Sequence, residues 1–212
     1  MNLADLPNAG RYGVILADFP WHFRTFDKVK AVPGRAAADP YPTMRREELA
    51  ALPIANLAAR DCALVLWIVG AHIPEALDLA KGYGFTFKTD LLIWDKGRMS
   101  MGYYTRKEAE QCFLFTRGSP RVMHRGIRQI IRAPRREHSR KPDEQYERLE
   151  ALFGGPYLEL FARQRRPGWD SWGNEVDKFS DPLELRRRRR DAALRLAAVR
   201  ASLGARRRRA GA

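Results

Sequence analysis

Short apolar runs alternate with helix-like segments from residue 12 to residue 162, and no other feature of the sequence constrains the fold as much. Residues 12–16 and 62–69 are apolar runs bounded by turn residues, as expected of buried strands. The same pattern predicts strands at 85–94, 110–116, 127–132 and 157–162, and helices at 46–52, 73–81 and 142–152. Strands separated by helices favour a three-layer α/β domain with a mainly parallel sheet, and the close spacing of the middle strands suggests some antiparallel pairing.

The composition is typical of globular proteins. With 212 residues and 45% hydrophobic content, the chain can bury one substantial core. Its longest apolar runs, such as residues 63–69, are far shorter than the roughly 20 residues that span a bilayer, and the first residues lack the pattern of a secretion signal. We therefore expect a soluble, cytoplasmic protein. Cys62 and Cys112 lie in strand-like segments without a nearby Cys or His pair, which favours inert core thiols over a metal site or a disulfide.

The net charge of +14 is unevenly distributed along the chain. Residues 181–212 carry 11 arginines against 3 acids, a net charge of +8, which leaves +6 for residues 1–180. Apolar residues at helical spacing between two arginine runs predict an appended basic helix. We expect a folded domain at 1–180 and a basic helical tail at 181–212 that attracts nucleic-acid phosphates in a salt-dependent way. Solubility, or contact with an acidic partner, is the alternative role of the tail.

Residues 17–21, Ala-Asp-Phe-Pro-Trp, directly follow the first predicted strand. An acid at the end of such a strand lies where open α/β sheets bind ligands, and Pro20 forces a turn that leaves nearby carbonyl groups free to accept hydrogen bonds. The exocyclic amine of adenine needs acceptors for its two hydrogens and a ring to stack on, which Asp18, a neighbouring carbonyl and Trp21 would supply. The alternative is structural, with an Asp that caps a turn and a Trp that fills the core.

Two further segments bear on the ligand. Residues 22–43 lack periodicity and predict a long loop beside this motif, as substrate-binding loops often are. Residues 97–102 begin and end with glycine but lack the spacing of a phosphate-binding loop, so a nucleoside triphosphate is not favoured.

Several motifs occur in a characteristic order between residues 11 and 176. They are Asp18-Phe19-Pro20-Trp21, followed by 64–67, 82–85, 94–96, 102–104, 113–118, 133–144, 159–163 and 167–175. In this order they resemble the adenine-N6 methyltransferases named for the seventy-kilodalton (MT-A) subunit of the messenger-RNA adenosine methylase, a family with bacterial and phage members. The first motif is similar to the family's Asp-Pro-Pro-Trp, and the order and spacing carry the resemblance more than any single piece does.

This resemblance implies a Rossmann-like fold with circularly permuted motif order and S-adenosylmethionine as the cofactor. The catalytic motif would be Asp18, Phe19, Pro20 and Trp21, and the cofactor site would be formed by Asp18, Lys141, Arg163, Asn174 and Glu175. Lys141 would contact the methionine end of the cofactor, and Arg163, Asn174 and Glu175 would line its ribose and adenine. The position of Lys141 beside a predicted helix N-terminus suits a carboxylate. The alternative readings are a surface Lys, a solvated Arg and an Asn that caps a turn.

Phe19 departs from the family pattern, because it replaces the first Pro of the motif. In the family, the Asp side chain and a backbone carbonyl of the motif bind the target amine, so the replacement bears on the rigidity and aim of that carbonyl. The Asp, the second Pro and the Trp are retained, which favours an active enzyme. Asp5 and Leu6 are weak candidates for a further contact with the cofactor's adenine.

Basic residues precede the predicted helix at 142–152. Arg135, Arg136 and His138 would grip substrate phosphates, with Arg140 in the same cluster, and a solvated structural face is the alternative. Trp21 and Phe23 would clamp the target base. The amine can lose its extra proton to solvent after transfer, so His22 is given no catalytic role.

The sequence thus predicts an S-adenosylmethionine-dependent methyltransferase acting on N6 of adenine in nucleic acid, with no metal and no membrane partner. We favour DNA over RNA because the chain is compact, has no evident RNA-binding module and is similar to prokaryotic members. An RNA adenosine methyltransferase and a noncatalytic nucleic-acid-binding subunit of the same fold are the alternatives. Whether the protein is a monomer or a dimer is left open by the sequence.

Overall fold

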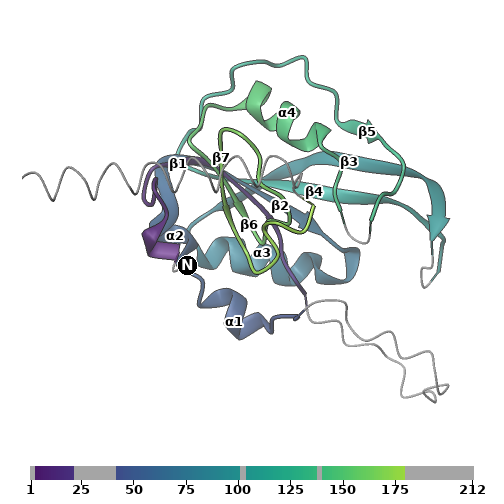
Figure 1. The fold of residues 1–212 in the computed structure, drawn as a ribbon, viewed down its shortest axis with the longest axis horizontal. Coiled ribbons are helices and arrows are strands. Elements are labelled where there is room, and N and C mark those ends of the chain that lie inside the picture. The colour runs from purple at the N-terminus through teal and green to yellow at the C-terminus, as the bar shows by residue number, and fades with distance from the viewer. Residues whose placement is uncertain (1–2, 22–41, 101–103, 138–139, 180–212) are drawn as a thin grey trace, which may run out of the picture.

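The computed structural model describes residues 3–21, 42–100, 104–137 and 140–179, which form a seven-stranded sheet with helices on both faces (Figure 1). The strands are β1 (Tyr12–Asp18), β2 (Ala58–Ile68), β3 (Thr86–Ser100), β4 (Lys107–Arg117), β5 (Ile130–Arg132), β6 (Tyr157–Leu160) and β7 (Trp169–Trp172). The helices are α1 (Arg46–Ala50), α2 (Ile54–Leu57), α3 (Ile73–Gly82) and α4 (Glu144–Leu152), with single 3-10 turns at η1 (Leu3–Asp5) and η2 (Gly70–His72).

The sheet has the order β5-β3-β4-β2-β1-β6-β7 and is mixed but mostly parallel. β1 runs parallel to its two neighbours β2 and β6, and the pairs β3–β5 and β6–β7 are also parallel. β4 lies antiparallel between β2 and β3. The predicted α/β class is therefore confirmed, together with the antiparallel pairing expected among the middle strands.

Helices cover the two faces of the sheet because β1 and β2 are apolar on both sides. Ile15 and Leu64 belong to a buried cluster that includes residues of α1, α2 and α3. Leu16 and Val65 belong to a second cluster on the other face, packed against Leu149 of α4. Figure 1 shows α4 on one side of the sheet and α1 and α3 on the other. This is the three-layer arrangement that near-continuous apolar strands require.

The predicted elements are present, with different ends. β3 and β4 are longer than expected and extend into a hairpin beyond the edge of the core, whereas β5 begins at Ile130 instead of residue 127. β6 was expected to be the last strand, and this was wrong, because β7 follows it and pairs with it in parallel. β7 is tied to β1 by Asp170, which accepts hydrogen bonds from the Tyr12 hydroxyl and the Asn8 amide.

Both cysteines are buried, as the sequence predicts for core thiols. Burial raises the pKa of Cys62 to about 12 and that of Cys112 well above its ordinary value. Within the described part of the chain, no helix is long and apolar enough to cross a membrane. Residues 22–41 of the loop predicted at 22–43, and the whole tail predicted at 181–212, lie outside the described residues.

Candidate active site

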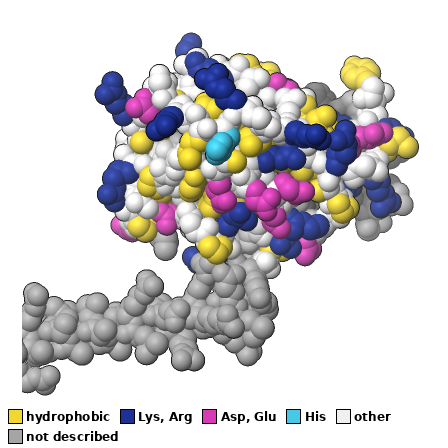
Figure 2. All heavy atoms as spheres, turned by 90° about the horizontal axis from the view of Figure 1, so that it is seen from above, with side chains coloured by type: hydrophobic (Ala, Val, Ile, Leu, Met, Phe, Trp, Pro, Cys, Tyr) yellow, Lys and Arg dark blue, Asp and Glu magenta, His cyan; other side chains and the backbone are white. Residues whose placement is uncertain are grey.

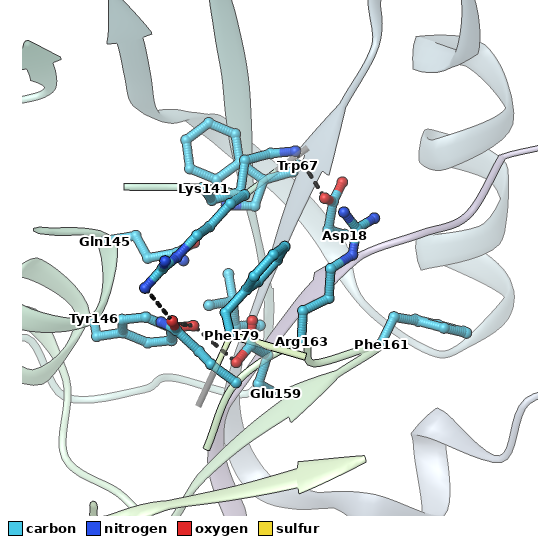
Figure 3. Close-up of a pocket in the computed structure, with 12 residues that line it drawn as sticks. Asp18, Trp67, Lys141, Gln145, Tyr146, Glu159, Phe161, Arg163 and Phe179 are labelled. Carbon is cyan, nitrogen blue, oxygen red and sulfur yellow. Dashed lines mark hydrogen bonds and ion pairs between the residues drawn. The ribbon is translucent and has the colours of Figure 1, made fainter. Parts of the chain in front are cut away.

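The candidate site lies where β1 ends. Asp18 is the last residue of β1 and pairs in register with Trp67 near the end of the parallel strand β2. Lys141 lies 123 residues further along the chain, just before α4, and its Nζ donates to Asp18 Oδ2 at 2.7 Å (Figure 3). Ligands of open α/β sheets bind at this carboxyl edge. The fold therefore brings Asp18 and Lys141, two of the predicted site residues, together where a ligand is expected.

Lys141 belongs to a chain of four alternating charges. Its Nζ lies 3.2 Å from Glu110 Oε2, and the other oxygen of Glu110 lies 3.3 Å from Lys96 Nζ. The Lys141 side chain is only 10% exposed. Burial alone would lower its pKa, but the charges of Asp18 and Glu110 outweigh burial and raise it above the ordinary value. Burial likewise opposes ionisation of Glu110, yet the two lysines hold its pKa below the ordinary value. Lys141 and Glu110 are therefore both charged at neutral pH.

A pocket opens beside Asp18 on the α4 side of this charge chain. Its lining combines cations, acids and aromatic rings from β1, β2, α4, β6 and the segments that flank them: Leu16, Asp18, Trp67, Arg140, Lys141, Gln145, Tyr146, Glu159, Phe161, Arg163, Gln164 and Phe179. Figure 3 shows the Phe179 ring lying between the Lys141 and Glu159 sides of the pocket. The guanidinium of Arg140 is stacked 5.1 Å from the centre of that ring.

Hydrogen bonds hold the polar wall of the pocket in place. The indole of Trp67 donates to Gln145 Oε1 at 2.7 Å, and the Tyr146 hydroxyl donates to Glu159 Oε2 at 2.9 Å. Burial raises the pKa of Glu159 to about 8, although the Tyr146 hydrogen bond acts in the opposite direction. Arg140 Nε is buried and has no hydrogen-bond partner among the described residues. The pocket therefore presents an unused donor and a carboxyl group that titrates near neutrality.

The predicted cofactor residues take different places relative to this pocket. Arg163 lines it, and its Nε lies 3.7 Å from Glu175 Oε2. Glu175 is thus adjacent to the pocket through Arg163 without lining it. Asn174 is exposed and lies outside the lining. Asp5 and Leu6 also lie outside it, and Leu6 is part of the apolar core.

The motif after β1 is more enclosed than its sequence suggests. The Phe19 carbonyl accepts from the Trp21 amide at 2.8 Å, and the Pro20 carbonyl accepts from the Met44 amide at 2.8 Å. Neither carbonyl is fully free, although each oxygen retains a second lone pair. The Trp21 ring is 4% exposed and stacks on His72, with 4.9 Å between ring centres and 6° between ring planes. A base stacked on that face of Trp21 would have to replace His72.

The predicted basic cluster divides into different roles. Arg136 donates to both carboxylate oxygens of Asp143 and to the Lys141 carbonyl, so it fastens the chain at the start of α4. Arg135 and Arg136 are both exposed, and both line a second, larger cleft with Lys96, Lys107, Glu110 and Trp94. Glu110 and Lys96 therefore connect the charge chain at Asp18 with this cleft. His138 and Phe23 lie outside the described residues.

Sequence reasoning did not single out Glu110, Glu159 or Gln164 as site residues. The sequence did contain a signal, which is an acid within or beside an apolar strand segment. Glu159 lies in the otherwise apolar strand β6, and Glu110 lies next to the buried half of β4. Acids are seldom placed in such strands unless they are paired. What they pair with depends on long-range contacts that no local pattern contains.

The fold and the site define a class: a Rossmann-like α/β protein with a polar and aromatic pocket at the carboxyl edge of its sheet. Comparison with known proteins specifies the family. The model of the MT-A70 family matches residues 12–175, and the chain belongs to that family of S-adenosylmethionine-dependent adenine-N6 methyltransferases.

Individual relatives agree with this assignment. The chain is 32% identical over 183 residues to the type II methyltransferase M.MunI of a Mycoplasma species, covering 78% of either protein. It is 29% identical over 179 residues to an N(6)-adenosine-methyltransferase MT-A70-like protein of Arabidopsis thaliana, covering 79% of this chain and 24% of that one. It is 28% identical over 185 residues to the human N(6)-adenosine-methyltransferase catalytic subunit METTL3, covering 82% of this chain and 30% of that one.

The residues of the pocket fit the family's cofactor. Lys141 and Arg140 offer cations to a carboxylate, and two of the three N–H donors of Lys141 are engaged by Asp18 and Glu110, which leaves one. Glu159 and Asp18 offer acceptors to hydroxyl groups and to a positive sulfonium. Phe161 and Phe179 provide flat apolar surface for a purine. When bound, S-adenosylmethionine supplies an activated methyl group.

Proposed function

We propose that this protein methylates N6 of adenine in DNA, with Asp18 receiving the target amine. The observation that carries the proposal is the charge chain from Asp18 through Lys141 and Glu110 to Lys96, because it runs from the aromatic pocket to the open cleft. The cofactor would occupy the pocket and the target base would reach Asp18 from the cleft. The Mycoplasma relative, a type II methyltransferase matched over most of its length, supports DNA over RNA.

The residues at the cofactor end have distinct tasks in this proposal. Lys141 holds the carboxylate with its remaining N–H donor, and Arg163 contacts the ribose and adenine portion from the end of β6. Glu175 orients Arg163 from 3.7 Å and completes that end with Asn174. Asn174 has to turn inward to do so, since it is exposed in this structure.

Asp18 can accept from the amine without releasing Lys141. Lys141 engages Oδ2, and Oδ1 has no hydrogen-bond partner among the described residues. A second acceptor is available at the Phe19 or the Pro20 carbonyl, each of which has one unused lone pair. Two acceptors on the amine hydrogens localise the nitrogen lone pair, which is otherwise delocalised into the ring. A bound S-adenosylmethionine would supply the methyl group to this nitrogen, and the amine would then lose its extra proton to water.

The nucleic-acid strand would follow the cleft. Arg135 and Lys107 line it together with Glu110 and would contact phosphates, as would His138. Arg136 contributes by fixing the position of Lys141. Trp21 and Phe23 would enclose the extruded base once His72 has given way. Figure 2 shows Lys and Arg side chains at several places on the face that it draws, interspersed with Asp and Glu.

The basic tail would act separately from the catalytic domain. With a net charge of +8, residues 181–212 add attraction to DNA phosphates that does not depend on base sequence. A DNA substrate and a soluble cofactor would both be available in the cytoplasm, where we propose that the protein acts.

The test is transfer of isotopically labelled methyl from S-adenosylmethionine to matched DNA and RNA oligonucleotides, read as N6-methyladenine by nucleoside mass spectrometry. Asp18→Asn removes the charge and keeps the size, and Asp78→Asn on α3 is the matched control away from the site. We expect product in DNA for the wild type and the control, and a loss of at least 100-fold for Asp18→Asn. Product only in RNA would show that the substrate is RNA instead of DNA. Cofactor binding without transfer to either polymer would favour the noncatalytic subunit.

A further inference from the structure

Phe19 lies at the centre of a row of aromatic rings that joins the motif to the wall of the cofactor pocket. Its ring meets Trp21 edge-on, with 5.4 Å between ring centres, and meets Phe161 edge-on at 5.7 Å. The row continues from Trp21 to the stacked His72 at one end and from Phe161 to Trp172 at the other, at 5.4 Å. We call these five residues the aromatic row.

Each end of the row is fixed by a different element. His72 ends η2, and its Nδ1 lies 2.7 Å from Glu75 Oε2 in the first turn of α3. Trp172 ends β7 and is paired in register with Leu160 of β6. Phe161 follows Leu160 and has a φ of 59°, a backbone conformation that is strained for a residue with a side chain. Its ring is held in the pocket wall by this backbone and by its two ring neighbours.

The position of Phe19 explains how the motif tolerates the loss of its first proline. A proline at that position would restrict the backbone through its own ring, whereas phenylalanine leaves φ free to vary. Here the Phe19 side chain is 3% exposed and is enclosed by rings on two sides. Packing therefore restricts the backbone that a covalent ring would restrict in the family's usual motif.

We propose that Phe19 is a positioning residue that couples the cofactor pocket to the base-binding end of the motif. A displacement of Phe161 in the pocket wall is transmitted to the Phe19 ring. From Phe19 it is transmitted to Trp21 and thus to the segment that carries the two acceptor carbonyls. The inference rests on the proposed location of the cofactor in the pocket lined by Phe161. It assigns to the Phe19 side chain a role that the Asp-Pro-Pro-Trp pattern does not contain.

Tryptophan indole N–H signals in a nitrogen–proton NMR correlation spectrum provide the test, with S-adenosylhomocysteine as the probe. Trp67 lines the pocket, whereas Trp21 does not line it and contacts the ring of Phe19, so the two indoles report on binding and on coupling respectively. They are assigned by Trp67→Phe and Trp21→Phe. In the wild type we expect the probe to shift both signals. In Phe19→Leu, which keeps apolar bulk without the ring, the Trp67 shift should persist and the Trp21 shift should fall by more than half.

Kinetics provide the second readout. For Phe19→Leu we expect kcat to fall roughly 10-fold to 100-fold, because the acceptor carbonyls are no longer held in position toward the amine. The Kd of the probe should change less than threefold. Phe115→Leu is the matched control, since Phe115 is buried in the same apolar cluster but lies on β4 outside the row. Its melting temperature should fall about as much as that of Phe19→Leu while its kcat stays within twofold of wild type.

A double-mutant cycle separates the relay from simple packing. If Phe19 acts through Phe161, the kcat of the double variant Phe19→Leu/Phe161→Leu should equal that of whichever single variant has the lower kcat. Independent, multiplying losses would overturn the inference, as would a Trp21 shift that survives in Phe19→Leu. Failure of the probe to move either indole signal in the wild type would overturn the location of the cofactor instead.

Discussion

Replacing Lys141 with methionine is expected to destabilise the protein strongly. Methionine fills similar space without the charge and leaves Asp18 and Glu110 facing each other without their shared cation. Removing one partner of a buried ion pair costs about 3–5 kcal/mol. Asp18 and Glu110 are 28% and 34% exposed, and water screens them in part. We therefore expect the free energy of unfolding at pH 8 to fall by about 2–3 kcal/mol.

The size of this loss should depend on pH. In the wild type, the lysines lower the pKa of Glu110 in spite of its burial, so its contribution to stability is present above its unfolded-state pKa and is lost as pH falls. Without Lys141, burial and the Asp18 charge should raise the pKa of Glu110, so protonation at low pH would relieve the repulsion. The difference between variant and wild type should therefore shrink to less than half on going from pH 8 to pH 5.

Urea unfolding at pH 8, 6.5 and 5, followed by tryptophan fluorescence, measures this directly. Lys88→Met is the matched control, since Lys88 is exposed on β3 and takes no part in the charge chain. It should change the free energy of unfolding by less than 0.5 kcal/mol at each pH, as surface substitutions generally do, to within about that margin. A Lys141→Met deficit of the same size at pH 8 and pH 5 would refute the reasoning, because the two carboxylates would then not be interacting.

Three further outcomes are expected. Burial raises the pKa of Glu159 to about 8. Its contribution to stability is therefore present below its unfolded-state pKa and is lost as pH rises to 8. The melting temperature of Glu159→Gln should vary less between pH 5 and pH 9 than that of the wild type. Arg135→Ala should weaken DNA binding and reduce its salt slope by about 1 without changing the melting temperature, whereas Arg136→Ala should lower the melting temperature by several degrees, as differential scanning fluorimetry would show. Truncation after Ser180 should weaken DNA binding and flatten its salt dependence, measured by fluorescence anisotropy, while loss of cofactor affinity in calorimetry would make the tail part of the fold.

The strands at the centre of the sheet were predictable because their signal is local. The apolar runs of β1 and β2 are long enough to identify buried strands, and the helices that follow them carry recognisable starts and stops. β7 was missed because Trp169–Trp172 includes an acid and a serine and has no apolar run. Its strand character comes from pairing with β6 and from the hydrogen bonds that Asp170 accepts.

The sequence by itself determined the α/β class, the acid at the end of β1 and the lysine before α4, since each depends on residues close together in the chain. Only the tertiary structure decided that Lys141 meets Asp18 across 123 residues, that Glu110 joins them, and that Arg136 fastens α4. The tertiary structure also decided the surroundings of Trp21. The motif predicts that its ring stacks on a base, but in the folded chain His72 covers that ring. Burial and charge pairing are properties of the packed chain, because they depend on which distant segments share a face of the sheet.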